Sequence, residues 1–122
     1  SEATGAPSYF VQVVIEETRA DRYLGGEHTS DHVWIRGDIR AGRTEQQRTS
    51  LMIKMMHDIS RITGVAQENV WVYVCNLEPT DMVEYGHVLP PPGQEKAWFD
   101  GLPASLRSYL AELGTTKENF QI

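Results

Sequence analysis

The sequence predicts an α+β domain with a mixed sheet and helices on one face. Three observations predict it: two strand-like segments at 32–40 and 69–77, a helical apolar pattern between them, and short connections joining all three. Such a βαβ unit has parallel strands and a right-handed crossover. With 122 residues, 40% of them apolar, the chain has the length of one ordinary domain. We therefore treat residues 1–122 as a single domain.

The first expected element is a strand over residues 8–17. Aromatic and β-branched residues dominate this stretch, SYFVQVVIEE, and charged residues end it. Residues 18–31 are polar and contain Gly25-Gly26. They predict a loop or a loose hairpin.

A second strand is expected at residues 32–40, because apolar residues alternate there. One face carries Val33, Ile35 and Ile39, and the other carries Trp34 and Arg36. Residues 69–77, NVWVYVCNL, are almost continuously apolar. That pattern predicts a strand covered on both faces.

The helix between these strands has a start signal, an apolar face and a stop signal. Thr44 can cap its first turn, and Gln47 three residues later completes a capping box. Gly64 follows the last periodic residue and can end the helix. The apolar residues at helical spacing are Leu51, Met52, Met55, Met56, Ile59 and Ile62.

The C-terminal third contains a loop and a last helix. Residues 90–92 are three consecutive prolines, which cannot continue a helix or a central strand. A helix is expected from about Pro103 to Gly114. Its inner side would carry Leu106, Tyr109, Leu110 and Leu113.

Composition argues against several classes of protein. A net charge of −6 opposes nucleic-acid binding, which needs a basic surface. Cys75 is the only cysteine, so the chain forms no internal disulfide. Without a run of 18 apolar residues or a signal-peptide pattern in residues 1–7, we expect a cytoplasmic protein with no membrane partner.

Two arginines stand where the second strand leads into the helix. Arg40 and Arg43 lie three residues apart across Gly42, in the stretch DIRAGRTEQQ. The carboxyl end of a parallel strand and the following helix N-terminus form a common ligand position, and a guanidinium binds a carboxylate through two hydrogen bonds. Spacing alone does not distinguish this anion site from ordinary surface pairs with Asp38 or Glu45.

Tyr73 and Glu84 are two further candidate site residues, and each also has an ordinary structural explanation. Tyr73 lies inside the apolar strand, where its phenol is either a satisfied core group or faces a cavity. Glu84 lies among apolar residues in DMVEYGH, where it is either solvated or partly buried with a raised pKa. The spacing of His28, His32, His57 and His87 matches no metal motif. We expect neither metal nor cofactor.

A series of motifs resembles the cis-3-chloroacrylic acid dehalogenase family of the tautomerase superfamily. The resemblance runs from about residue 9 to residue 113 and rests on an ordered series rather than on one motif. Its members are RAGRTE at 40–45, VWVY at 70–73, MVEYG at 82–86, LP at 89–90, PG at 92–93 and WF at 98–99. The resemblance implies a tautomerase (MIF-like) β-α-β fold, assembled as a trimer.

The resemblance also implies a role for each candidate residue. Arg40 and Arg43 would hold and polarise the carboxylate of a small substrate, while Tyr73 and Glu84 orient and activate a water. Water would add to a short unsaturated (3-halo)carboxylic acid, and the product would collapse to malonate semialdehyde and halide. No cofactor is implied.

One feature of the family has no counterpart in this sequence. The family starts with a proline whose free amine carries a proton, followed by a strand and a helix with a histidine. Pro7 is an internal amide and cannot replace that amine. We expect a fragment, a partner chain that supplies the proline, or a non-catalytic relative; cleavage after Ala6 would be a fourth explanation.

The leading hypothesis is therefore a dehalogenase or hydratase of small unsaturated acids that works as a homotrimer or with a partner chain. A promiscuous keto-enol tautomerase or a malonate semialdehyde decarboxylase is an alternative in the same pocket. A non-catalytic carboxylate-binding subunit is the alternative from another class.

Overall fold

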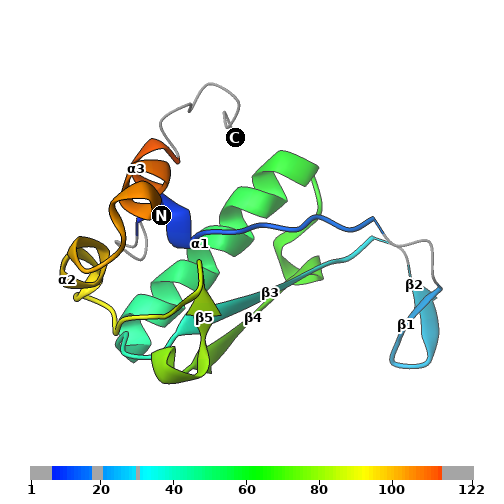
Figure 1. Cartoon of the computed structure of the whole chain (residues 1–122). Helices are drawn as coiled ribbons and strands as arrows, with labels where there is room; N and C mark the ends of the chain where they lie inside the picture. Colours follow the sequence, from blue (N-terminus) through cyan, green and yellow to red (C-terminus); the bar gives the residue numbers. More distant parts are fainter. Residues whose placement is uncertain (1–6, 18–20, 30, 114–122) are drawn as a thin grey trace.

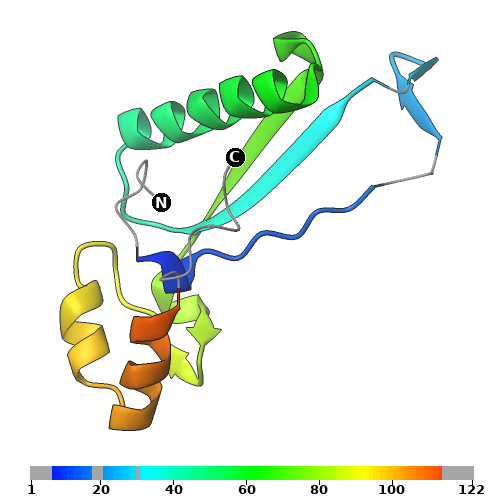
Figure 2. The same ribbon diagram turned by 90° about the horizontal axis from the view of Figure 1, so that it is seen from above.

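The computed structural model of the chain describes residues 7–17, 21–29 and 31–113. Its central unit is the parallel pair β3 (Val33–Arg40) and β4 (Val70–Leu77), joined by helix α1 (Glu45–Thr63). Figures 1 and 2 show α1 lying along one face of this pair. The predicted βαβ unit is confirmed.

Both helix signals read from the sequence act as predicted. The Thr44 hydroxyl accepts a hydrogen bond from the Gln47 backbone N–H at 3.1 Å, and the Gln47 side chain accepts one from the Thr44 N–H at 2.9 Å. At the other end, Gly64 has φ 77° and its N–H bonds to the Ser60 carbonyl. This left-handed conformation suits glycine because it has no Cβ.

The prediction of a strand over residues 8–17 is wrong for this chain. Ser8–Phe10 forms the 3-10 turn η1, and residues 11–17 have no regular secondary structure. Figures 1 and 2 both show this segment running beside β3, on the side away from β4. Within the described residues β3 pairs with β4 alone. A strand needs a hydrogen-bonded neighbour, so the β-forming composition of the segment is not sufficient.

The Gly25-Gly26 region forms the loose hairpin that its composition allowed. Strands β1 (Arg22–Leu24) and β2 (Glu27–Thr29) pair antiparallel at the amino end of β3. A second hairpin, β5 (Val83–Glu84) and β6 (His87–Val88), was not predicted. Its two turn residues, Tyr85 and Gly86, have φ 56° and 78°. Positive φ at both positions is the type I′ geometry that suits a two-residue hairpin.

The C-terminal part contains two helices where the sequence predicted one. Helix α2 (Glu95–Asp100) was missed, and α3 (Ala104–Glu112) matches the expected last helix. Residues 90 and 91 lie outside helices and strands, as the prolines predicted. Leu110 is 1% exposed, whereas Tyr109 is 56% exposed, so the prediction that Tyr109 faces inward is wrong. The expected helix stop at Gly114 lies outside the described residues.

The sheet face opposite α1 is uncovered, so the prediction that β4 is covered on both faces is wrong for the single chain. Trp34, Trp71 and Tyr73 on this face are 57%, 41% and 49% exposed. The one crossover helix can cover one face, and the described residues bring no second layer. The buried apolar side chains, each at most 5% exposed, lie away from this face and mostly in the C-terminal segment: Val70, Leu89, Leu102 and Leu110.

Candidate active site

Arg40 ends β3 with its guanidinium buried. The residue is 4% exposed. Its Nη1 donates to the Pro90 carbonyl at 2.7 Å, and its Nη2 donates to Glu95 Oε1 at 2.9 Å. The guanidinium carbon lies 4.5 Å from the centre of the Phe10 ring, which is cation–π geometry. Arg40 thus joins η1, β3 and the C-terminal segment.

Arg43 lies beside Arg40, in the turn before α1. Its Nη1 donates to the Arg40 carbonyl at 3.0 Å, and Arg48 from the first turns of α1 donates to the Arg43 carbonyl. The Arg43 Nε is buried and has no hydrogen-bond partner among the described residues. Burial and the charge of Arg40 lower the pKa of Arg43. Two adjacent guanidinium charges, one of them partly desolvated, favour an anion nearby.

Gly42 sets the approach of this turn to the proline loop. Its φ is 127°, and a Cβ built at this position would lie 3.0 Å from the Pro92 Cδ. Any other residue would strain the backbone there and require Pro92 to shift. The glycine between Arg40 and Arg43 is therefore a packing requirement of the site.

Glu84, on the β5–β6 hairpin, belongs to the same region. Burial raises its pKa, and the charge of Arg40 acts in the opposite direction. Its neighbour Tyr85 donates a hydrogen bond from its hydroxyl to the Tyr9 carbonyl, which ties the hairpin to η1. A carboxyl group held in a partly desolvated position near arginines can exchange a proton with bound water.

Tyr73 is not brought to this group within one chain. Arg36 stands opposite Tyr73 in the β3–β4 register, and Arg40 stands opposite Leu77. Tyr73 lies four residue steps from Leu77, which separates it from Arg40 by about 13 Å along the strand. Arg43 therefore lies beside Arg40, and the charge of Arg40 acts on Glu84, whereas Tyr73 lies nearer the amino end of the sheet.

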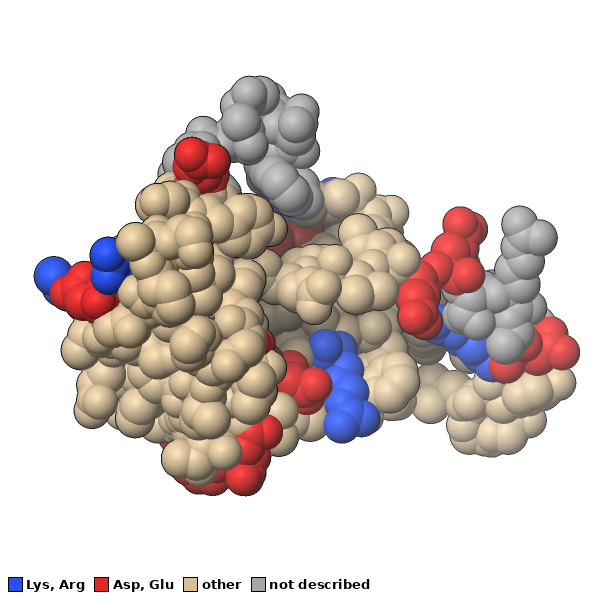
Figure 3. All heavy atoms as spheres, in the orientation of Figure 1, with Lys and Arg blue, Asp and Glu red and all other residues tan. Residues whose placement is uncertain are grey.

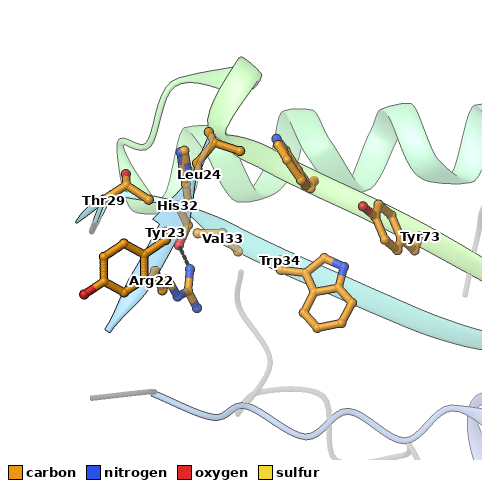
Figure 4. Close-up of a pocket in the computed structure, with 9 residues that line it drawn as sticks. Arg22, Tyr23, Leu24, Thr29, His32, Val33, Trp34 and Tyr73 are labelled. Atoms are coloured by element: carbon orange, nitrogen blue, oxygen red, sulfur yellow. Dashed lines mark hydrogen bonds between the residues drawn. The ribbon is translucent and has the colours of Figure 1, made fainter. Parts of the chain in front are cut away.

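Tyr73 instead lines an aromatic pocket of about 350 Å³. Its ring meets Trp34 edge to face, with centroids 5.7 Å apart. In Figure 4 both rings lie on one face of the strands, and Arg22 hydrogen-bonds the His32 carbonyl at the pocket's far end. The other lining residues are Tyr23, Leu24, Thr29, Val33 and Trp71.

Sequence reasoning missed Glu95 and Phe10, which hold Arg40. Both oxygens of Glu95 accept hydrogen bonds, Oε1 from Arg40 and Oε2 from the Gly93 N–H at 2.8 Å. Burial raises the Glu95 pKa, but the hydrogen bonds from its own backbone N–H, from Arg40 and from Gly93, together with the Arg40 charge, lower it overall. A glutamate 55 positions along the chain from Arg40 carries no local signal of this contact. Spacing had suggested only Asp38 or Glu45 as ion-pair partners.

The described part of the chain contains no group of three or more His, Cys, Asp or Glu side chains placed to hold a metal. No helix found there has the length and apolar character to cross a membrane. On the face drawn in Figure 3, Lys and Arg lie singly among Asp and Glu and form no continuous basic surface.

Comparison with known proteins identifies the family. A tautomerase enzyme family model matches residues 8–82. A solved structure of N1, a member of the cis-3-chloroacrylic acid dehalogenase family, is 40% identical, with a TM-score of 0.88 over 92% of this chain and 80% of that one. The chain belongs to the cis-3-chloroacrylic acid dehalogenase family of the tautomerase superfamily. The predicted resemblance and tautomerase fold are thereby confirmed.

More distant structures share the fold with this dehalogenase-family chain. The structure of Pt0534 inactivated by 2-oxo-3-pentynoate is 26% identical, with a TM-score of 0.66 over 72% of each chain. A fused 4-oxalocrotonate tautomerase, an asymmetric trimer, is 24% identical with a TM-score of 0.65 over 71% of this chain and 72% of that one. No curated protein matches the sequence.

Proposed function

We propose that this chain adds water to a short unsaturated (3-halo)carboxylic acid such as cis-3-chloroacrylate. The hydroxyl joins the third carbon, a proton joins the second, and the halohydrin then loses H⁺ and halide to leave malonate semialdehyde. Family membership supports a dehalogenase-like or tautomerase-type activity. The observation that carries the proposed reaction is the adjacent pair Arg40 and Arg43 at the carboxyl end of β3, with the charge of Arg40 acting on the partly buried Glu84.

Each residue has a role that its surroundings support. The Arg43 guanidinium binds the substrate carboxylate, and the positive charge of the adjacent Arg40 adds to the attraction. Negative charge builds on that carboxylate as an enediolate forms. Fixed guanidinium groups stabilise this charge more than the ground state, and so they lower the barrier. Glu84, with its raised pKa, accepts a proton from the attacking water.

A homotrimer would bring Tyr73 to the site of a second copy. Tyr73 lies about 13 Å along the sheet from the arginines of its own chain and on an exposed aromatic face. Packing that face against a neighbour would remove Trp34 and Trp71 from water and place a phenol beside another copy's Glu84. The trimeric state of the fused tautomerase agrees with this assembly.

The proton that reaches the second carbon needs a donor besides these residues. Pro7 cannot supply it, because its nitrogen is an amide and its carbonyl already accepts a hydrogen bond from the Phe10 N–H at 3.1 Å. Residues 11–17 and the free edge of β3 run side by side without pairing among the described residues. We propose that a further strand, carrying the family's amino-terminal proline, pairs there as part of the active assembly.

The test is incubation of the protein with cis-3-chloroacrylate, following malonate semialdehyde and chloride in equal amounts. Arg43→Ala and Glu84→Gln should each abolish turnover, while exposed Asp100→Asn should not change it. Formation of both products at the wild-type rate by either site variant would rule out the assigned roles. Keto-enol conversion or loss of CO₂ from malonate semialdehyde would instead identify the two alternative activities of this pocket.

A second candidate function is binding of carboxylates without turnover. The specific observation in its favour is that a single chain has the arginine pair but holds Tyr73 apart from it. Calorimetric titration with cis-3-chloroacrylate should then show binding that Arg43→Ala removes, with no product formed. The predicted cytoplasmic location has no bearing on either test.

A further inference from the structure

Tyr85 occupies a turn position that does not favour tyrosine. It is the first of the two turn residues of the β5–β6 hairpin, and its φ is 56°. Asparagine followed by glycine is the pair that a type I′ turn prefers, because both central residues have positive φ. Among the described non-glycine residues, Tyr85 alone has positive φ. The turn geometry therefore gives no reason for a tyrosine here, and the reason must lie in its side chain.

The Tyr85 side chain bonds to a backbone group that the neighbouring turn leaves free. Its hydroxyl donates to the Tyr9 carbonyl. The hydrogen bonds that close the 3-10 turn η1 use the carbonyls of Pro7 and Ser8 instead. The Tyr85 and Tyr9 rings also meet edge to face, with centroids 6.4 Å apart. The phenol of Tyr85 thus joins the turn end of the hairpin to η1.

The same short turn holds Arg40. Phe10 follows Tyr9 in η1, and the Arg40 guanidinium carbon lies 4.5 Å from the centre of the Phe10 ring. Glu84 directly precedes Tyr85, and the charge of Arg40 acts on its pKa. Two adjacent residues of η1 therefore hold the arginine on one side and the neighbour of Glu84 on the other.

The hairpin is also held at its open end. Trp98 in α2 donates a hydrogen bond from its Nε1 to the Val88 carbonyl at 2.8 Å. The Trp98 ring stacks with the Tyr9 ring, with centroids 6.3 Å apart. Two strands of two residues each are too short to be stable alone. The position of the hairpin therefore depends on these contacts with η1 and α2.

We propose that Tyr85 is a positioning residue, whose hydroxyl bond to the Tyr9 carbonyl keeps Glu84 at a fixed place relative to Arg40. The proposal rests on the proposed role of Glu84 in activating water. Without the bond, the turn end of the hairpin can move and water reaches the Glu84 carboxyl group. A base that is displaced from its substrate by a small distance loses much of its effect on the rate.

Three variants separate the hydroxyl from the turn and from the fold. Tyr85→Phe keeps the ring and removes the hydrogen bond to Tyr9. Tyr85→Asn also removes the bond, but it introduces a residue that the turn conformation favours. Tyr109→Phe is the matched control, because it removes the hydroxyl of a tyrosine in α3 that is 56% exposed.

The first measurement needs no turnover. The pKa of Glu84 is followed by NMR titration of its carboxyl carbon, assigned with Glu84→Gln. Burial raises this pKa in the wild type. It should fall toward its ordinary value in both Tyr85 variants and keep its raised value in Tyr109→Phe. A lower urea midpoint with an unchanged Glu84 pKa would show that Tyr85 is merely structural, and would overturn the proposal.

The second measurement follows turnover of cis-3-chloroacrylate. Tyr85→Phe should lower kcat by about tenfold and leave KM nearly unchanged, because the arginines still hold the substrate carboxylate. A raised KM with unchanged kcat would overturn the positioning role. A lowered Glu84 pKa with unchanged kcat, or no turnover even by the wild type, would contradict the proposed reaction and leave the positioning of Glu84 by Tyr85 standing.

Discussion

Arg40 Nη2 donates to Glu95 Oε1 at 2.9 Å, and this contact ties the end of strand β3 to the start of helix α2. The two side chains are 4% and 17% exposed. Because both partners have left water, the pair depends on its own hydrogen bonds and on those from Pro90 and Gly93. The C-terminal helices are thereby fixed relative to the βαβ unit at the point where the site lies.

Removing one partner of this buried pair should destabilise the fold. Arg40→Met leaves Glu95 charged and unpaired, so we expect a loss of about 3 kcal/mol in the free energy of unfolding. Urea denaturation measures it. Lys96→Met is the control, because its pair with Asp100 is exposed and should leave the urea midpoint unchanged. Equal midpoints for Arg40→Met and wild type would contradict a structural role for the pair.

Glu84 should make stability fall as pH rises. Burial raises its pKa in the folded chain, so the folded state holds the proton more tightly than the unfolded state. The stability it contributes is complete below the unfolded pKa and is lost as pH rises through the folded pKa. Glu84→Gln cannot ionise and should gain stability relative to wild type over that window. Urea midpoints at a series of pH values measure this difference.

Asp58 is a control for the Glu84 measurement, because its pKa is lowered and its effect on stability should change with pH in the opposite direction. The hydrogen bond from Lys54 is the first cause that lowers the Asp58 pKa. Wild type should therefore gain stability relative to Asp58→Asn as pH rises through the lowered pKa. If Glu84→Gln and Asp58→Asn gave pH profiles of the same sign, the burial of Glu84 would not be the cause.

Gly42 should tolerate alanine less well than Gly64. Both have positive φ, but a Cβ at Gly64 meets nothing within 4 Å, whereas one at Gly42 lies 3.0 Å from Pro92. Gly64→Ala should cost about 1 kcal/mol from its backbone conformation alone. Gly42→Ala should cost more and should also weaken carboxylate binding, because Pro92 and the arginines must shift. Equal losses of stability would show that Pro92 moves freely.

Mixing Tyr73→Phe subunits with Arg43→Ala subunits should restore some activity. Tyr73→Phe and Arg43→Ala should each be inactive, since each removes one part of every site. If Tyr73 reaches the site of a second copy, subunits exchanged between the two variants would form some sites with both residues, and turnover would return in part. Turnover that stays absent after verified exchange would exclude a contribution of Tyr73 from another copy.

Local patterns were sufficient for the elements whose causes are local. The capping pair Thr44 and Gln47 and the stop at Gly64 act through neighbours within four residues, so the bounds of α1 could be predicted. The parallel pairing of β3 and β4 followed from the short crossover. The arginine pair was visible because Arg40 and Arg43 are neighbours along the chain.

Long-range contacts were not visible in the same way. Residues 11–17 have the composition of a strand, yet pairing depends on a neighbour that the described residues do not supply. The Arg40–Glu95 pair and the separation of Tyr73 from the arginines depend on where distant segments meet. The sequence by itself determined the βαβ unit and the family, because local patterns encode both. Only the tertiary structure decided that Glu95 pairs with Arg40 and that Tyr73 lies apart from the arginines, because burial and pairing are properties of the assembled fold.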